Sequence, residues 1–215
     1  MSTTIKYTNQ DFEPITEQQV GFLKFYNKQF FVNNELKKIE RYGPLGRTNT
    51  IILIGGEYYL SDNEDIQVTI NQYISSARYW TFYYNKQTNS FGDTYHDIIS
   101  FKEGLLDYKT RQVTNNEGQL IAFCSIDIAT GQIDDRRKMF YGDINVYKRV
   151  YYDSKFLSVS YEDNDISGIY IYDEDYQSVS EFLSSSFSQY FDWMSHTYYH
   201  SFEPMLPTGV IARPH

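Results

Sequence analysis

The pattern of apolar and polar residues from Arg78 to Tyr172 is that of successive β-strands. Short runs rich in aromatic and β-branched residues follow one another, and several alternate apolar with polar positions. Turn-forming residues, as at 115–118, separate most of these runs. The pattern predicts an antiparallel meander with one packed face and one more solvated face. The expected strands cover residues 79–84, 95–101, 105–113, 120–128, 133–141, 144–152, 156–161 and 169–172.

Two segments have helical spacing instead. Residues 61–64 have the form of a capping box, and apolar residues then recur every three or four positions, which predicts a helix over about 62–75. Residues 178–181 form another capping box, and an apolar stripe continues to Tyr198. The stripe predicts an amphipathic C-terminal helix over about 179–199, which ends before Pro204. The expected fold class is therefore α+β, mostly antiparallel.

The N-terminal region leaves an alternative open. Residues 16–19 can be a capping box that starts a short helix, and residues 21–26 can equally form a strand. Residues 30–42 predict a hairpin, because the Asn33-Asn34 pair tolerates the positive φ of a tight turn. We expect one globular domain over 1–215, in which residues 1–60 can form a small subregion.

Two glycine-containing segments are interpreted as turns. Residues 43–46 and the pair Gly55-Gly56 lack the lysine, the Ser/Thr and the helix start that allow a loop to bind phosphate. No strand–helix alternation runs through the chain, which argues against a doubly wound nucleotide-binding fold.

Composition adds an unusual aromatic content and a negative charge. The 215 residues include 22 Tyr, 15 Phe and 2 Trp, and tyrosine suits both half-buried sheet faces and binding surfaces. The net charge of −9 argues against a general nucleic-acid binder and favours a partner with a basic surface. Neither a secretory signal nor a membrane-spanning apolar stretch is visible, so we expect a cytoplasmic protein with no membrane partner.

One acidic segment matches the ligand spacing of a calcium-binding loop. Asp163, Asp165, Ser167, Gly168 and Glu174 fall at positions 1, 3, 5, 6 and 12 of an EF-hand pattern. An EF-hand loop follows a helix, however, whereas the preceding residues 156–161 have the pattern of a strand. A hairpin turn with acidic residues is therefore the favoured interpretation.

A second metal hypothesis concerns the C-terminal helix. Asp192, His196 and His200 are spaced four residues apart, so a helix would place them on one face, where they could bind zinc or iron. That face lies opposite the apolar stripe, and a solvated face is the favoured interpretation. We expect no other cofactor.

The remaining candidates for catalysis are weak. His96 and Asp97 are neighbours in an expected strand, so their side chains point to opposite faces and cannot form a dyad. Cys124 is the only cysteine, which excludes an intramolecular disulfide, and its apolar surroundings favour an inert thiol. The sequence therefore favours a protein that is not an enzyme.

The leading hypothesis is a non-enzymatic binding protein, most concretely an immunity protein that neutralises a cognate bacterial toxin. In class-level features the chain resembles such inhibitors, which are small, acidic and free of catalytic motifs. The expected partner surface combines carboxylates and tyrosines. Its residues are Tyr161, Glu162, Asp163, Asp165, Tyr170, Tyr172, Asp173, Glu174 and Asp175.

Three alternatives remain open at this point. A carbohydrate- or ligand-binding β module could use Tyr79-Trp80, residues 82–84 and Trp193 for stacking. An enzyme with a dispersed or metal-assisted site and a structural or phage-assembly subunit are the other two. The sequence alone identifies neither the partner nor the oligomeric state.

Overall fold

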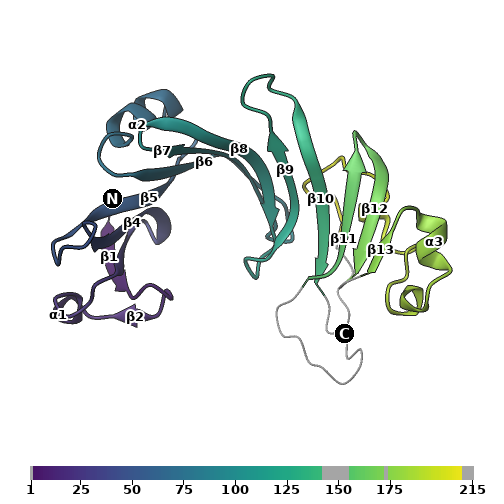
Figure 1. Ribbon diagram of the computed structural model, residues 1–215, viewed down its shortest axis with the longest axis horizontal. Helices are drawn as coiled ribbons and strands as arrows, with labels where there is room; N and C mark the ends of the chain where they lie inside the picture. Colours follow the sequence, from purple (N-terminus) through teal and green to yellow (C-terminus); the bar gives the residue numbers. More distant parts are fainter. Residues whose placement is uncertain (1, 142–154, 172–173, 210–215) are drawn as a thin grey trace. The chain divides into compact units, whose positions relative to one another are not determined.

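The chain is built around a mostly antiparallel β-sheet of 13 described strands (Figure 1). The computed structural model describes residues 2–141, 155–171 and 174–209. In these residues the strand order is β13-β12-β11-β10-β9-β8-β7-β6-β5-β4-β3-β1-β2, which confirms the predicted antiparallel meander. The predicted strand 144–152 lies outside the described residues. The strands are β1 (Thr3–Thr8), β2 (Pro14–Ile15), β3 (Tyr26–Val32), β4 (Glu35–Pro44), β5 (Ile51–Tyr59), β6 (Tyr79–Thr88), β7 (Thr94–Lys102), β8 (Leu105–Thr114), β9 (Leu120–Ile126), β10 (Ile133–Tyr141), β11 (Lys155–Glu162), β12 (Asp165–Ile171) and β13 (Glu174–Tyr176).

The first strands follow the local signals of the sequence closely. Helix α1 (Glu17–Val20) begins at Thr16, whose side chain and that of Gln19 form the reciprocal bonds of a capping box. No strand starts between the end of β2 at Ile15 and Tyr26, so the helical interpretation of this region is the correct one. Asn33 and Asn34 join β3 to β4 with φ angles of 51° and 68°, as the predicted hairpin requires.

Gly55 and Gly56 lie inside strand β5 and not in a turn, so that interpretation was wrong. Strand β5 pairs in parallel with β6, opposite Tyr79 and Trp80. A Cβ atom on Gly55 would lie 2.9 Å from the Tyr79 carbonyl oxygen, and one on Gly56 would lie 2.6 Å from the Ile39 carbonyl oxygen. The glycines are therefore needed because neighbouring groups approach the β5 backbone closely.

Helix α2 (Ile66–Tyr73) is the crossover between the parallel strands β5 and β6. It confirms the predicted mid-chain helix but begins later, because Asp65 is the N-cap and accepts the Val68 N–H at 2.9 Å. The expected cap at Ser61 belongs instead to a turn, in which the Glu64 carboxylate accepts the Ser61 N–H at 2.7 Å.

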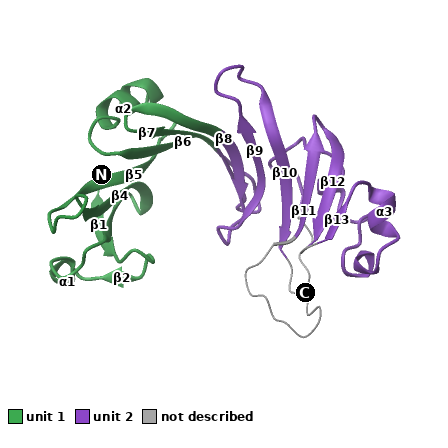
Figure 2. Cartoon of the chain, viewed as in Figure 1, with its two compact units in different colours: residues 1–86, 97–109 green, residues 87–96, 110–215 purple. Residues whose placement is uncertain are grey.

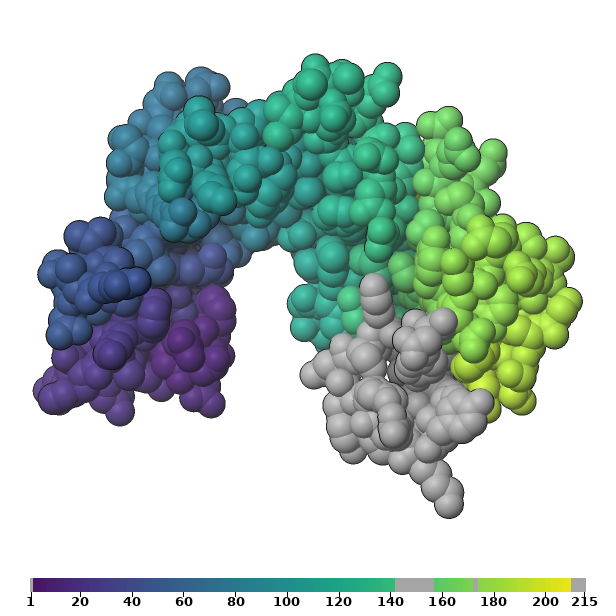
Figure 3. Space-filling view, viewed as in Figure 1, coloured from purple at the N-terminus to yellow at the C-terminus, as the bar shows by residue number. Residues whose placement is uncertain are grey.

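The chain forms two compact units (Figure 2). Unit 1 comprises Met1–Lys86 and Asp97–Lys109, and unit 2 comprises Gln87–His96 and Thr110–His215. The buried apolar cluster of unit 1 joins the sheet to α2 and contains Leu60, Ile70, Trp80 and Phe82. The larger cluster of unit 2 joins strand residues to the C-terminal segment, whose yellow-green atoms lie beside the light-green atoms of residues 155–171 (Figure 3). Its members include Val113, Leu157, Val159, Ile169, Ile171, Phe182, Phe191, Trp193, Tyr199 and Phe202.

The prediction of one helix over 179–199 is correct for its beginning and wrong for the rest of the segment. Helix α3 (Val179–Leu183) starts at the Ser178 cap as expected, but it ends at Ser184. The 3-10 turns η1 (Ser186–Tyr190) and η2 (Thr197–Tyr199) follow. The serines supply the reason: the Ser185 hydroxyl accepts the Phe187 N–H at 3.2 Å and so begins a new turn.

The apolar stripe of that helix is also not a single face. Met194 remains 73% exposed, whereas Trp193, which the stripe did not include, is buried. The segment follows the sheet in irregular turns, because these bury its large aromatic side chains more completely than one straight helix would.

Candidate functional site

The hairpin of β11 and β12 carries the most acidic part of unit 2. Asp163 and Asn164 form its two-residue turn, with a φ of 53° at Asp163. Glu162, Asp163 and Asp165 are exposed. Asn164 attaches the turn to the C-terminal segment, because its Oδ1 accepts the Glu203 N–H at 2.7 Å and its carbonyl accepts the Phe202 N–H at 3.3 Å. The tip is therefore attached to the C-terminal segment by two hydrogen bonds of Asn164.

The calcium-loop spacing does not become a loop in the fold. Asp163 lies in the hairpin turn, whereas Ser167 lies inside strand β12 and Glu174 opens the next strand, opposite Ile171. An extended strand cannot wrap its oxygens around a cation as a twelve-residue loop does. The acidic hairpin turn favoured by the sequence is the observed structure.

Residues that the sequence analysis did not include enlarge the acidic region. Strand β10 pairs with β11 through Arg136 and Tyr161, which brings the start of β10 beside the hairpin turn. Glu203 joins from the C-terminal segment through its bond to Asn164. We call this region the acidic end. Its carboxylates are Asp134, Asp135, Glu162, Asp163, Asp165 and Glu203, and all six residues are exposed.

Two arginines neutralise part of this charge. Arg136 contacts Asp163 at 3.3 Å, and Arg137 contacts Asp135 at 2.6 Å. The other four carboxylates have no ion pair with a residue in the part of the chain that the structure describes. Exposed carboxylates of this kind create a negative potential that attracts a basic surface over a distance.

The remaining predicted partner residues lie elsewhere. Asp175 pairs with the 41%-exposed Tyr170, and Glu174 pairs with Ile171. This second patch lies at the far end of β12, about 20 Å from the acidic end at roughly 3.3 Å per residue. Tyr161 is buried, and its hydroxyl donates to the Tyr199 carbonyl at 2.9 Å, so it is not a surface residue. Tyr172 and Asp173 lie outside the described residues.

Lys138 follows Arg136 and Arg137 in the sequence, but its side chain is completely buried. Its ammonium group donates to the carbonyls of Tyr198 at 2.7 Å, Ser201 at 2.9 Å and Pro204 at 3.0 Å. Burial lowers the pKa of Lys138 to about 7, and the charge of Glu203 opposes that change. This one side chain therefore fastens the C-terminal segment to strand β10.

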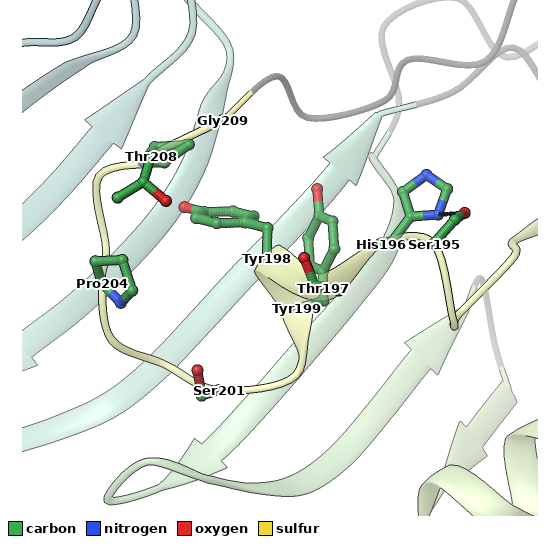
Figure 4. A pocket seen from close by; sticks show the side chains of 10 residues that line it. Ser195, His196, Thr197, Tyr198, Tyr199, Ser201, Pro204, Thr208 and Gly209 are labelled. Carbon is green, nitrogen blue, oxygen red and sulfur yellow. Dashed lines mark hydrogen bonds between the residues drawn. The ribbon is translucent and has the colours of Figure 1, made fainter.

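A pocket of about 210 Å³ lies on the same segment (Figure 4). The side chains of Tyr198 and Thr208 point toward each other across it, and His196 and Ser195 lie at its other side. The lining residues are Ser195, His196, Thr197, Tyr198, Tyr199, Ser201, Pro204, Pro207, Thr208 and Gly209.

The two histidines of the proposed metal site do not share a helix face, because no helix forms there. His196 Nδ1 lies 2.6 Å from the Asp192 carbonyl, and its ring stacks on Phe191. His200 Nε2 lies 2.8 Å from the Trp193 carbonyl. Across residues 2–141, 155–171 and 174–209, no three or more His, Cys, Asp or Glu side chains form a group that could hold a metal ion.

The possible nucleophiles are engaged in other interactions. His196 Nδ1 must donate to a carbonyl, so it cannot accept the proton of Ser195, although the two atoms lie 3.3 Å apart. Burial raises the pKa of the Cys124 thiol to about 11, which keeps it protonated at neutral pH. Asp97 accepts a hydrogen bond from Asn85 at 2.6 Å.

The aromatic side chains considered for sugar stacking are mostly in the cores. Trp80, Phe82 and Trp193 are buried, so their faces cannot contact a ligand, whereas Tyr79 is 40% exposed. No helix among the described residues is long and apolar enough to cross a membrane.

Comparison with known proteins adds no relative. The chain matches no protein-family model, no curated protein and no solved structure.

Proposed function

We propose that this protein is a non-enzymatic inhibitor that binds a basic protein partner through the acidic end of unit 2. Its most concrete form is a cytoplasmic immunity protein that neutralises a cognate bacterial toxin. The observation that carries the proposal is the group of six exposed carboxylates from three separate segments, of which two, Asp135 and Asp163, are paired with arginines among the described residues. Such a surface accelerates association with a basic partner and discriminates against acidic ones.

The way the acidic end is held supports a role in binding. Asn164 connects the hairpin turn to the C-terminal segment, and Lys138 connects that segment to β10. A surface that is already ordered loses little conformational entropy when it binds. The backbone that carries the carboxylates is therefore anchored, which favours a partner with a defined pattern of positive charge.

The second patch supplies an aromatic group for the same role. Tyr170 is 41% exposed beside Asp175, and a half-exposed tyrosine next to a carboxylate is suited to an interface position. It lies too far along β12 to belong to the acidic end. A partner that contacts both would cover the whole hairpin.

The test is protection followed by isolation of the complex. A basic toxin encoded beside the gene is expressed with and without this protein, and cell survival and a stoichiometric complex on gel filtration are measured. Survival and a stable complex are the expected results. Cells that die at the same rate in both cultures, with no complex formed, would show that the protein is not the inhibitor of that toxin.

A further inference from the structure

The pocket beside Tyr198 adjoins the acidic end. Glu203 belongs to the acidic end and lies in sequence between Ser201 and Pro204, which both line the pocket. The volume of about 210 Å³ corresponds to about seven water molecules at roughly 30 Å³ each. It is smaller than the roughly 300–1,000 Å³ of pockets for drug-sized ligands. The pocket therefore has the size for one side chain of a partner.

Three hydroxyl groups around the pocket have already donated their protons to the backbone. The Ser195 hydroxyl donates to the Asp192 carbonyl at 3.1 Å, and the Ser201 hydroxyl donates to the Glu203 carbonyl at 2.8 Å. The Tyr198 hydroxyl donates to the Met205 carbonyl at 2.5 Å. Because each proton is in use, the oxygen atoms can offer only lone pairs to a ligand.

The donor nitrogen of His196 is also in use. Its Nδ1 lies 2.6 Å from the Asp192 carbonyl and must carry the proton there, so Nε2 of the neutral ring is an acceptor. The stacking of this ring on Phe191, with centres 4.3 Å apart, fixes its orientation. The Ser195, Ser201 and Tyr198 oxygens and His196 Nε2 are thus hydrogen-bond acceptors on the pocket lining, and a complementary ligand is rich in donors.

The charges near Tyr198 favour a cation. Burial raises the pKa of Tyr198 well above its ordinary value, and the nearby carboxylates of Asp93 and Glu203 raise it further. The positive charge of Lys138 opposes the binding of a cation, because its ammonium group lies 3.7 Å from the centre of the Tyr198 ring. Burial lowers the pKa of Lys138 to about 7, so its positive charge weakens as the pH rises above neutrality.

We propose that this pocket binds the cationic head of a lysine or arginine side chain. The identity of that side chain as part of the toxin rests on the proposed function, but the chemistry of the pocket does not. The acidic end attracts the basic partner, and the pocket holds one of its side chains. This division fits an interface in which charge sets the association rate and one inserted side chain slows dissociation.

The test uses free amino-acid amides at pH 8 and the whole chain. Nα-acetyl-arginine amide and Nα-acetyl-lysine amide are titrated while the NMR signals of His196 and Thr208 are followed. At least one is expected to bind with a dissociation constant on the order of 1 mM, and the comparison shows which head the pocket prefers. Nα-acetyl-glutamine amide, which is neutral, is expected to shift neither signal. Equal binding of the glutamine amide, or no shift with either cation, would overturn the proposal.

A tethered cation supplies the matched control. Thr208 is exposed, so Thr208→Lys places an ammonium at the pocket without disturbing the core, and Thr208→Gln adds length without charge. The lysine variant is expected to weaken binding at least about tenfold and the glutamine variant by less than about twofold. Gln132→Lys makes the same change of charge at an exposed turn away from the pocket and is expected to have no effect. Equal losses in both Thr208 variants would contradict a charge-based pocket.

The assay contains no partner protein, so its outcome is independent of the proposed function. If the amides do not bind but toxin binding still depends on the acidic end, the proposed pocket is wrong and the proposed inhibitor function stands. If the amides bind but the protein does not protect cells, the proposed pocket stands and the proposed inhibitor function is wrong.

Discussion

The ammonium group of Lys138 lies 3.7 Å from the centre of the Tyr198 ring and donates a hydrogen bond to the carbonyl of the same residue at 2.7 Å. A buried cation is costly unless its protons find acceptors, and here three backbone carbonyls of the C-terminal segment receive them. Because that segment also contacts Asn164, Lys138 contributes to the placement of the acidic end.

Replacing Lys138 tests its role in fastening the segment. Lys138→Met keeps the aliphatic stem but leaves three carbonyls without a donor, so we expect the free energy of unfolding to fall by about 1–3 kcal/mol. Urea unfolding measures the change. Lys24→Met, at an exposed position, is the control and is expected to change stability by less than about 0.5 kcal/mol. Equal stability of the two variants would show that the three bonds contribute nothing.

Stability is also expected to depend on pH through Lys138. Burial lowers its pKa from 10.5 to about 7 in the folded chain, so between these values the unfolded chain binds more protons than the folded chain. The free energy of unfolding therefore rises with pH above about 7, by about 1 kcal/mol per pH unit. Denaturation at pH 7.0 and 8.5 measures the slope, which Lys138→Met should remove. A slope that persists in that variant would assign the effect to another group.

Ser158 provides a test of buried hydrogen bonding. It is 4% exposed in strand β11, and its hydroxyl has no hydrogen-bond partner among the described residues. Since a buried hydroxyl without a partner is destabilising, Ser158→Ala is expected to leave the free energy of unfolding unchanged or raise it by about 1 kcal/mol.

Ser100 is the matched control for Ser158. It is equally buried, but its hydroxyl lies 3.1 Å from the Thr81 hydroxyl and 3.3 Å from the Trp80 carbonyl. Ser100→Ala is expected to lower the free energy of unfolding by about 1 kcal/mol. Thermal denaturation compares the two, and a loss of stability in both would contradict this assignment.

The glycine pair in β5 makes a prediction about backbone packing. Gly56→Ala would place a Cβ atom 2.6 Å from the Ile39 carbonyl oxygen and from the Trp80 ring, so we expect a loss of about 1–3 kcal/mol. Gly21→Ala places its Cβ at an ordinary 3.8 Å from the Gln18 carbonyl oxygen, so we expect little change in the free energy of unfolding. Circular dichroism melting curves measure both, and similar midpoints would argue against the close approach.

Local signals predicted the parts of the fold that depend on neighbouring residues. The Thr16 capping box and the Asn33-Asn34 turn are set by bonds and φ angles within a few residues, and both were read correctly from the sequence. The meander followed from the alternation of its strands. The C-terminal helix failed because tertiary burial of its aromatic side chains overrides the helical spacing.

Another local signal was present but not recognised. Asn9, Asn89 and Asn115 each follow a threonine and each open a hairpin loop with the same set of hydrogen bonds. In every case the side-chain oxygen accepts the N–H groups two and four residues later. A search for this Thr-Asn pattern would have located the turns at Asn9 and Asn89 in addition to the turn at 115–118 that was predicted, although the pair also occurs at Thr48-Asn49.

The candidate site was only partly predictable. Glu162, Asp163 and Asp165 are adjacent in sequence and were recognised, whereas Glu203 joins them only through the fold. Asp134 and Asp135 lie close to the basic residues Arg136, Arg137 and Lys138 in the sequence, which masks their contribution to an acidic surface, yet Lys138 is buried. The apolar residues that follow it, Met139 and Phe140, were the available signal for its burial.

The central claim is that the acidic end captures a basic partner, and association kinetics test it most directly. Glu162→Lys with Asp165→Lys reverses two exposed charges while retaining Asp163, whose positive φ suits Asp. Asp62→Lys with Asp107→Lys makes the same change of net charge at exposed positions of unit 1. Stopped-flow mixing with the purified toxin should show an association rate constant at least about tenfold lower for the first variant and nearly unchanged for the second. Equal association rates for the two variants would contradict the account.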